Sequence, residues 1–422
     1  MKKKRKKILF VVNTLGRAGA ETALMELLRR LDSQEYELFL YVIMGQGEMK
    51  GEIPSHVKLL NTRFNSQSVM TGKGKRAMTG TIAVAFIRNG RYLRKICCIA
   101  RNFVSMKRKG KVWPEKLFWR MLSDGAVRFP VVFDLAVAYL EGASAYYVAD
   151  HVKAKKKCAF IHIDYESAGY TREMDEGCWD SFEKIFTVSD EVKEHFLAVY
   201  PEHARKTDVF HNLIDQEMIK RRAQEKGGFE DSYSGIRLLT VGRLTWQKAY
   251  DIAIDAMKLL KDEGVKARWY VLGEGDKRRM LEKKIEAEGL EEDFLLPGAA
   301  KNPFPYYAQT DLYIHATRFE GKSIAIQEAQ TLGCAVIASD QSGNREQIEN
   351  GKDGILCPLT ARGIADSIKE LIGDEEKRKR IKNAASAKVT AQEEELKKLL
   401  EFLDGRQDDG EKRSTDYHTS IQ

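Results

Sequence analysis

The sequence has few cysteines and no paired cysteine motif. Six cysteines are scattered through the 422 residues, and the two that are adjacent, Cys97 and Cys98, have poor geometry for a disulfide bond with each other. No C-x2-C spacing, which would indicate a zinc or redox site, is present. This pattern favours a reducing compartment, and we expect a cytoplasmic protein.

The sequence also lacks a long apolar run. No segment approaches the roughly 20 apolar residues that a membrane-spanning helix needs. The first apolar segment, Ile8–Val12, follows a basic leader and imitates a signal peptide, but it is short and runs into the polar Asn13 and Thr14. We therefore expect it to form the first β-strand behind a solvated basic tail.

Acidic residues are scarce between Arg63 and Arg128, where 16 Lys and Arg face only two acids, Glu115 and Asp124. The whole chain has a net charge of +8, so the remainder is net acidic. Within this region, residues 81–111 mix apolar and basic side chains, as in helices that lie on anionic membranes. We expect peripheral attachment to the inner membrane face, with a solvated helical insertion as the alternative. Because stacking aromatics are not interleaved with the cations, we expect no nucleic-acid partner.

Short apolar runs alternate with amphipathic runs in the rest of the chain. Strands alternating with helices predict parallel sheets with helices on both faces. The expected strands lie at 7–13, 37–44, 133–140, 157–163, 183–189 and 208–214 in the first half, and at 237–244, 267–275, 293–298, 311–317, 335–340 and 353–358 in the second.

This rhythm predicts an α/β protein built from two Rossmann-like domains that face each other across a cleft. We assign residues 1–215 to the first domain, which contains the basic insertion 63–128. Residues 216–235 form the linker, and residues 236–404 form the second domain. The polar residues 405–422 are expected to be a disordered tail.

Two loops after predicted strands have residues that suit a phosphate group. In the first domain, Gly16 and Gly19 flank a turn that opens a helix, where a ligand can approach unpaired N–H groups. In the second domain, Gly242 is followed by Arg243 and Lys248, and two cations on such a loop suit a diphosphate. The alternatives are a tight strand-to-helix turn and a pair of exposed basic residues.

A third loop, RFEGKSIAIQEAQTLG at 318–333, also joins a strand to a helix. Ser323 is placed to cap this helix. Glu320 precedes the cap and Glu328 follows it, so both carboxylates can face one ligand near the helix start. The stretch equally resembles a P-loop in which Ala316 replaces the first glycine before Gly321-Lys322-Ser323, which leaves an ATPase open as an alternative.

Taken together, these pieces resemble the family 4 glycosyltransferases, retaining enzymes of GT-B fold. The resemblance covers nearly the whole chain except residues 63–128 and the tail. The matching pieces, in the family's order, are the turn with Gly16, Gly19 and Glu21, then TVGRL-x3-K, VLGEG, the E-x7-E of Glu320 and Glu328, GCAVIASD, SGNREQI and NGKDGIL.

The resemblance implies roles for residues of the second domain. Arg243 and Lys248, which follow Gly242, would hold the donor diphosphate and stabilise the charge on the departing nucleotide. Glu320 would lie beside the donor sugar, and Glu328 would bind the ribose hydroxyls. The backbone amides of four residues would cap the phosphates: Gly321, Lys322, Ser323 and Ile324.

In the first domain, the resemblance implies that His162 reaches the sugar near the reaction centre. Gly16 and Gly19 would let the first turn close over the phosphates. Two departures leave the donor open: Ala18-Gly19 stands where two glycines are usual, and Lys322 stands where the family's G-F-G has phenylalanine.

The implied reaction is transfer of a hexose from a nucleotide sugar, with UDP expected as the nucleotide, to a lipid-linked or polysaccharide acceptor with retention of configuration. No cofactor is expected, and no metal, since the folded part has no D-x-D motif and the spacing of His151, Cys158 and His162 fits no usual zinc site. A non-catalytic nucleotide-sugar-binding protein and an epimerase of the same fold remain as further alternatives.

Overall fold

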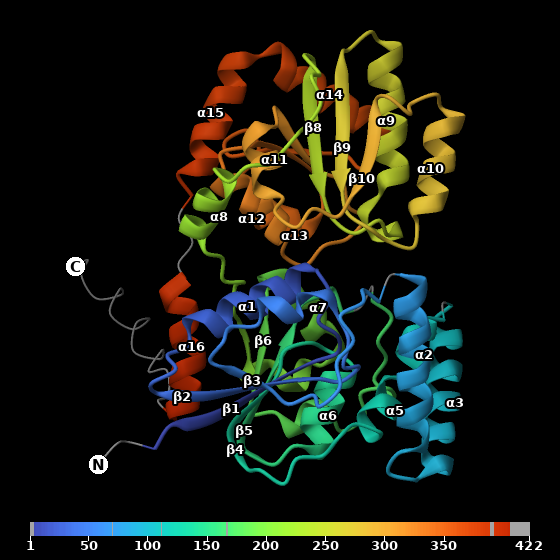
Figure 1. Ribbon diagram of the computed structural model, residues 1–422, viewed down its shortest axis with the longest axis vertical. Helices are drawn as coiled ribbons and strands as arrows, with labels where there is room; N and C mark the ends of the chain where they lie inside the picture. Colours follow the sequence, from blue (N-terminus) through green and yellow to red (C-terminus); the bar gives the residue numbers. More distant parts are fainter. Residues whose placement is uncertain (1–3, 70, 111, 166–167, 389–391, 406–422) are drawn as a thin grey trace, which may run out of the picture.

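The structure is a computed structural model that describes residues 4–69, 71–110, 112–165, 168–388 and 392–405. These residues form two lobes, drawn one above the other in Figure 1. Each lobe is built on a parallel sheet, with strand order β3-β2-β1-β4-β5-β6-β7 in the first lobe and β10-β9-β8-β11-β12-β13 in the second. The predicted α/β class with two Rossmann-like domains is confirmed.

Strand β1 lies inside the first sheet, between β2 and β4. Residues Ile8 to Val12 of this strand are fully buried, because helices cover both faces of the sheet. Ile8 pairs with Leu38 on one side and Leu135 on the other. The strands are β1 (Lys6–Val12), β2 (Tyr36–Val42), β3 (Val57–Leu59), β4 (Phe133–Ala138), β5 (Ala154–Ile161), β6 (Lys184–Thr187) and β7 (Thr207–Val209).

The basic insertion of the first lobe is helical. Its longest helices, α2 and α3, lie side by side at one edge of the lobe, with α5 between them and the body (Figure 1). The helices of this lobe are α1 (Gly19–Arg30), α2 (Gly72–Ile87), α3 (Tyr92–Arg108), α4 (Pro114–Leu117), α5 (Trp119–Asp124), α6 (Ala143–His151) and α7 (Asp190–Val199), with short 3-10 turns η1 (Glu48–Glu52), η2 (Trp179–Ser181) and η3 (Pro201–Lys206).

The second lobe repeats the pattern around β8. Its strands are β8 (Ile236–Val241), β9 (Ala267–Leu272), β10 (Phe294–Gly298), β11 (Leu312–His315), β12 (Ala335–Ser339) and β13 (Ile355–Cys357). Its helices are α9 (Tyr250–Asp262), α10 (Arg278–Ala287), α11 (Phe304–Gln309), α12 (Ile324–Thr331), α13 (Ser342–Arg345), α14 (Ala361–Gly373) and α15 (Glu375–Ser386), with the 3-10 turn η4 (Trp246–Lys248).

Two connections join the lobes. Helix α8 (Gln216–Ala223) opens the predicted linker, and its first turn is capped by the Asp215 carboxylate, which accepts from the Met218 N–H at 2.8 Å. Helix α16 (Gln392–Asp404), which we placed in the second domain from sequence, packs on the first lobe. The Lys6 ammonium lies 2.5 Å from the Asp404 carboxylate, and Lys398 donates to the carbonyl of Val209 at 2.8 Å. The chain therefore crosses between the lobes twice.

Within the part of the chain that the structure describes, none of the helices combines the length and apolar character needed to cross a bilayer.

Candidate functional site

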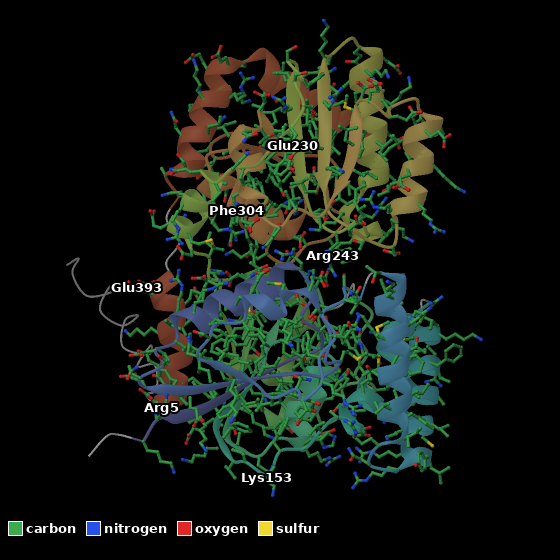
Figure 2. The ribbon with its side chains drawn as sticks, in the orientation of Figure 1. Arg5, Lys153, Glu230, Arg243, Phe304 and Glu393 are labelled. Carbon is green, nitrogen blue, oxygen red and sulfur yellow. The ribbon has the colours of Figure 1, made fainter. Side chains whose placement is uncertain are left out.

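The loop between β8 and α9 carries three of the predicted site residues, Gly242, Arg243 and Lys248. The Tyr250 hydroxyl donates to the carbonyl of Gly242 at 3.1 Å. Ala249, fully buried, has a φ of 48°, a left-handed conformation that non-glycine residues adopt only when packing holds them there. These constraints fix the loop, and Arg243 lies where the second lobe faces the first (Figure 2).

Lys248 forms an ion pair with Glu320, and both side chains are largely shielded from solvent. The pair joins the β8–α9 loop to the β11–α12 loop. His315, at the end of β11, places its Nε2 3.1 Å from the Glu320 carboxylate, and the Tyr313 hydroxyl lies 3.3 Å from Nδ1 of His315. Because an ammonium has three N–H donors, Lys248 keeps donors for a second anion after pairing with Glu320.

The charge state of this network follows from its geometry. Burial alone would raise the pKa of Glu320, but the Lys248 ammonium and the His315 hydrogen bond outweigh it and hold the pKa at about 2. Burial, together with the nearby Lys248 charge, lowers the pKa of His315. At neutral pH, Glu320 is therefore a carboxylate and His315 a neutral imidazole that donates from Nε2 to Glu320.

Glu328 occupies a different environment on α12. It accepts a hydrogen bond of 3.1 Å from the hydroxyl of Tyr307 on α11. Burial raises the pKa of Glu328 to about 7, although the Tyr307 hydrogen bond and the Arg222 charge act in the opposite direction. The two glutamates of the E-x7-E pattern thus differ, since Glu320 is firmly ionised and Glu328 titrates near neutrality.

The start of helix α12 faces the first lobe. Ser323 stands at the predicted N-cap position, but its side chain makes no capping hydrogen bond, so the first helical amides have no side-chain acceptor there. A Cβ on Gly321 would lie 2.6 Å from the carbonyl oxygen of His162. A Cβ on Gly19 would lie 3.8 Å from the side chain of Ile324. The uncapped start of α12 therefore meets the start of α1, where Ala18 likewise makes no side-chain cap.

His162 is held next to this junction as a neutral ring. Its backbone N–H donates to the Glu141 carboxylate at 3.2 Å, and its ring packs 4.9 Å from that of Tyr139. Burial lowers the pKa of His162 to about 3, and its Nε2 has no hydrogen-bond partner among the described residues. A buried ring nitrogen without a partner is a candidate contact for a ligand hydroxyl.

Glu21, in the first turn of α1, lies close enough to Arg243 of the second lobe for their charges to interact. Burial raises the pKa of Glu21 to about 7, while the positive charge of Arg243 acts to lower it. Glu141 also lies near enough to raise it. An acidic side chain of the first lobe therefore faces the exposed guanidinium of the second.

Gly16 lies in the turn that leads into α1, and a Cβ placed there would meet no atom within 4 Å. The neighbouring Leu15 N–H donates to the carbonyl of Gln46 at 2.8 Å, and the Arg17 N–H donates to Glu48 at 3.2 Å. The turn is anchored on both sides while open space remains at Gly16.

The Lys322 side chain points away from these groups. Its Nζ lies 2.9 Å from Nδ1 of His211, in a cavity of about 200 Å³ where α12, the segment 211–216 and α16 meet. This cavity is not lined by Arg243, Lys248, Glu320 or Glu328. The P-loop interpretation would need the lysine to turn toward a phosphate at the start of α12, and its side chain contacts the first lobe instead.

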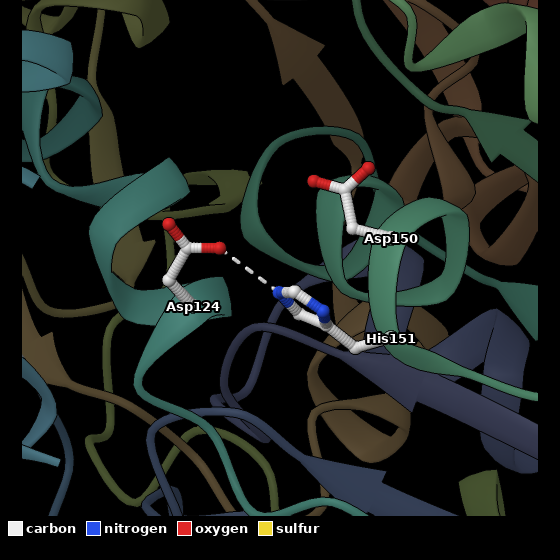
Figure 3. Close-up of side chains that lie close together, drawn as sticks. All are labelled: Asp124, Asp150 and His151. Carbon is white, nitrogen blue, oxygen red and sulfur yellow. Dashed lines mark hydrogen bonds and ion pairs between the residues drawn. The ribbon is translucent and has the colours of Figure 1, made fainter. Parts of the chain in front are cut away.

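One group of potential metal ligands appears among the described residues: Asp124, Asp150 and His151 (Figure 3). Each side chain already has a protein partner. His151 lies 3.0 Å from the Asp124 carboxylate, and Arg120 donates to Asp150 at 2.6 Å. The cluster ties α5 to α6 in the first lobe. Cys158, which the sequence places near His151 and His162, is instead buried in β5.

The structure thus brings together most of the predicted site. Lys248 and Glu320 contact each other, and Gly321 and Ile324 meet His162 and Gly19. Sequence reasoning missed His315 and Tyr307, which hold the two glutamates. A histidine at the buried end of DLYIHAT, five residues before Glu320, was the available signal for the first, and Tyr307 has no motif that marks it.

Comparison with known proteins agrees with this geometry. The family described as "Glycosyl transferases group 1" matches residues 229–388, which include Arg243, Lys248, Glu320 and Glu328. N-acetylgalactosamine-N,N'-diacetylbacillosaminyl-diphospho-undecaprenol 4-alpha-N-acetylgalactosaminyltransferase of Campylobacter jejuni is 31% identical over 189 residues, which cover 44% of this chain and 50% of that protein. Alpha-D-kanosaminyltransferase of Streptomyces kanamyceticus is 30% identical over 175 residues, covering 40% of this chain and 45% of that protein. The matches span half the length of these relatives or less.

A likeness to a solved structure extends over both lobes. The crystal structure of Anabaena Alr3699/HepE in complex with UDP and glucose superimposes with a TM-score of 0.65 and 17% identity, covering 95% of this chain and 100% of that chain. This likeness confirms the predicted GT-B fold.

Proposed function

We propose that this chain is a group 1 glycosyl transferase, a family that matches residues 229–388, and that it transfers a sugar from a nucleoside diphosphate sugar to a glycan acceptor. UDP is the nucleotide we expect, and a hexose the transferred group. The acceptor we expect is a lipid-linked or polysaccharide glycan. The family match covers the second lobe, and the proposal extends the glycosyltransferase activity to the whole protein.

The arrangement around Lys248 carries the proposal. Lys248 is oriented by Glu320, Arg243 lies nearby at the boundary of the lobes, and the uncapped starts of α1 and α12 meet beside them. Cations and helix-start amides that converge on one place form an anion site suited to a diphosphate.

The proposed chemistry follows from this anion site. As the bond between the anomeric carbon and the β-phosphate oxygen breaks, its electron pair stays with the nucleotide. An acceptor hydroxyl oxygen bonds to the anomeric carbon, and its proton passes to the leaving diphosphate. Arg243 and Lys248 stabilise that charge, and preorganised groups of this kind are worth about 3 to 4 kcal/mol each in a transition state. We propose that these two cations do so without a metal ion.

His162 contributes through its unpartnered Nε2 rather than through charge. A pKa of about 3 keeps the ring neutral, so it serves as a hydrogen-bond partner for a sugar hydroxyl. Glu320, with its carboxylate committed to Lys248 and His315, positions the donor sugar and the lysine together. We propose retention of anomeric configuration and assign no covalent nucleophile.

The acceptor proposal rests on the relatives. The name of the Campylobacter jejuni relative describes a diphospho-undecaprenol acceptor, and the Anabaena structure contains UDP and glucose. A lipid-linked acceptor would place the reaction at the cytoplasmic face of a membrane, and we propose that location for this chain.

The test begins with a thermal-shift screen of the full-length chain against UDP-, GDP-, ADP- and dTDP-sugars. The sugar that stabilises the chain most is then supplied with and without a lipid-linked glycan acceptor, and nucleotide release and product stereochemistry are measured. Acceptor-dependent release with a retained product supports the proposal. Binding without release would indicate a non-catalytic nucleotide-sugar-binding protein. Conversion of the sugar without an acceptor would indicate an epimerase. ATP hydrolysis that Lys322→Ala abolishes would indicate an ATPase.

A further inference from the structure

Helix α3 buries several polar side chains and exposes much of its apolar surface. Lys95, Asn102 and Ser105 are buried together with Met106, and Ile99 is half-buried. Its outer face carries Leu93, which is 80% exposed, with Ile96 and Phe103 also exposed. A surface helix normally buries its apolar stripe against the core, so this stripe has no partner within the described residues.

The exposed apolar side chains concentrate on the α2–α3 hairpin, which we define as residues 72–108. Of the eleven large hydrophobic residues that are exposed in the described part of the chain, seven lie here. They are Val84 and Ile87 on α2 and Tyr92, Leu93, Ile96, Phe103 and Val104 on α3. Leu93, Ile96, Ala100 and Phe103 are spaced three and four residues apart, so they form one continuous stripe.

The charged residues of the hairpin are all basic. No Asp or Glu occurs between Glu52 and Glu115 in the sequence. Arg91, Lys107 and Arg108 are exposed on α3 or at its start, and they make no ion pair among the described residues. The outer stripe is therefore bordered by cations that have no protein partner.

Hydrogen bonds hold the turn between the two helices in place, so this exposure is built into the fold. Lys95 donates to the carbonyls of Ala85, Phe86 and Arg88 at 2.6 to 2.8 Å and so caps the end of α2. Asn89, with a φ of 64°, donates from its side chain to the carbonyl of Asp124 at 2.8 Å.

The cluster in Figure 3 contacts the hairpin through Asp124. Asp124 is held by His151 at 3.0 Å and lies 3.8 Å from Arg94 of α3. The body of the first lobe thus fixes which face of α3 points outward, and a mobile loop is not needed to explain the exposed stripe.

Both ends of the hairpin contact segments next to the candidate site. At the start of α2, Gln46 donates to the carbonyl of Gly74 at 3.1 Å, and the carbonyl of Gln46 accepts from Leu15 beside Gly16. At the end of α3, the Ser105 hydroxyl lies 2.9 Å from that of Thr171, in the loop that follows His162. The hairpin therefore borders the part of the first lobe that would receive an acceptor.

We infer that the outer face of the α2–α3 hairpin docks on an anionic lipid bilayer, with the apolar stripe entering the interface and the bordering cations contacting lipid phosphates. Apolar and basic groups on one rigid face match the two layers of such an interface. A second copy of the chain is a poorer occupant, because two such faces would bring like charges together. The inference deepens the proposed function, and its biological meaning rests on that function, but the docking itself is measured without catalysis.

The test uses flotation of the full-length chain with vesicles of phosphatidylcholine, alone or mixed with phosphatidylglycerol, at low and high salt. We expect binding to the mixed vesicles at low salt and weaker binding to the neutral ones. The variant Leu93→Glu/Ile96→Glu, at two exposed positions, should reduce binding by about tenfold or more. The control Met280→Glu changes an exposed apolar residue of the second lobe and should bind like the wild type.

A second readout uses Cys97, which is exposed on the outer side of α3. In a Cys98→Ser background, an environment-sensitive fluorophore on Cys97 should brighten when mixed vesicles are added. Three results would overturn the inference: no flotation of the wild type, equal flotation of the Leu93→Glu/Ile96→Glu variant, or a dimer in vesicle-free solution that this variant abolishes. Nucleotide-sugar binding and turnover, measured on the same samples, report separately on the proposed function.

Discussion

Lys248 and Glu320 form an ion pair that joins the loops after two neighbouring strands of the second sheet, β8 and β11. The carboxylate holds the ammonium in place, and His315 holds the carboxylate in turn. A lysine tethered in this way is preorganised for a diphosphate, because its direction does not change when the ligand arrives.

Removing the ammonium should abolish most of the activity. We expect Lys248→Ala to reduce kcat/KM by roughly 10² to 10³-fold, because the departing nucleotide loses a preorganised cation. The measurement is sugar transfer at matched protein concentration after thermal melting has shown that the variant folds. Lys258→Ala is the control, since that lysine pairs with Asp262 on the exposed side of α9. Equal loss in both variants, or none in either, would contradict the assigned role.

The ion pair between Lys248 and Glu320 also predicts how the free energy of unfolding changes at acidic pH. Glu320 has a folded-state pKa of about 2, below its ordinary value of 4.5. Its stabilisation is therefore fully present above about pH 4.5 and is lost as the pH falls through about 2, and it amounts to at most about 3 kcal/mol. We expect Glu320→Gln to unfold more easily than the wild type at neutral pH, and the difference to shrink as the solution is acidified. Urea unfolding at several pH values measures it, and a difference that is constant with pH would refute the ion-pair assignment.

Contact between the lobes depends on the small size of Gly321. A Cβ at this position would lie 2.6 Å from the His162 carbonyl oxygen and 3.3 Å from the Val192 side chain, so the lobes would have to separate. We expect Gly321→Ala to lower kcat by about tenfold or more, since small displacements of reacting groups are costly. UDP affinity of the variant should change little, because the backbone amide remains.

The matched control for Gly321→Ala is Gly373→Ala, where an added Cβ meets no atom within 4 Å. Transfer rate and UDP titration by calorimetry separate the two effects. A Gly321→Ala enzyme with normal kcat would show that this contact is not maintained during turnover.

Each strand that we predicted from an apolar run is present. These strands could be predicted because parallel strands buried on both faces have continuous apolar sequences. Strand β3 was missed, since its three residues include the exposed Lys58 and form no pattern. The hairpin helices were hard to predict because α3 places Lys95 and Ser105 inside and Leu93 outside, the reverse of the usual rule.

The sequence predicted those site residues whose place on a loop after a strand determines where they lie in the fold. Lys248 and Glu320 follow strands of one sheet, and the ends of parallel strands meet at one edge. The direction of the Lys322 side chain could not be read from the sequence, because its partner His211 lies in the other half of the chain. We assigned helix α16 to the second lobe because it follows that lobe along the chain. Its apolar face does not show which lobe it packs against, and the structure places it on the first lobe.

Replacing Glu328 with glutamine should raise the stability of the fold and weaken donor binding. Its folded-state pKa of about 7 lies above its ordinary value of 4.5, because burial disfavours the carboxylate. The folded state therefore bears no penalty below about pH 4.5, an increasing penalty as the pH rises to about 7, and a constant one above, of about 3 kcal/mol. Glu328→Gln keeps an acceptor for Tyr307 and removes the charge.

We accordingly expect Glu328→Gln to be more stable than the wild type at about pH 8 and equal to it at about pH 4.5. If Glu328 binds the ribose, the same variant should bind UDP more weakly, by about tenfold, because a charged acceptor is lost. Glu286→Gln on the exposed face of α10 is the control and should change neither quantity. Thermal melts across this pH range and UDP titration measure both. A stability gain with unchanged UDP affinity would leave the burial argument standing and remove Glu328 from the donor site.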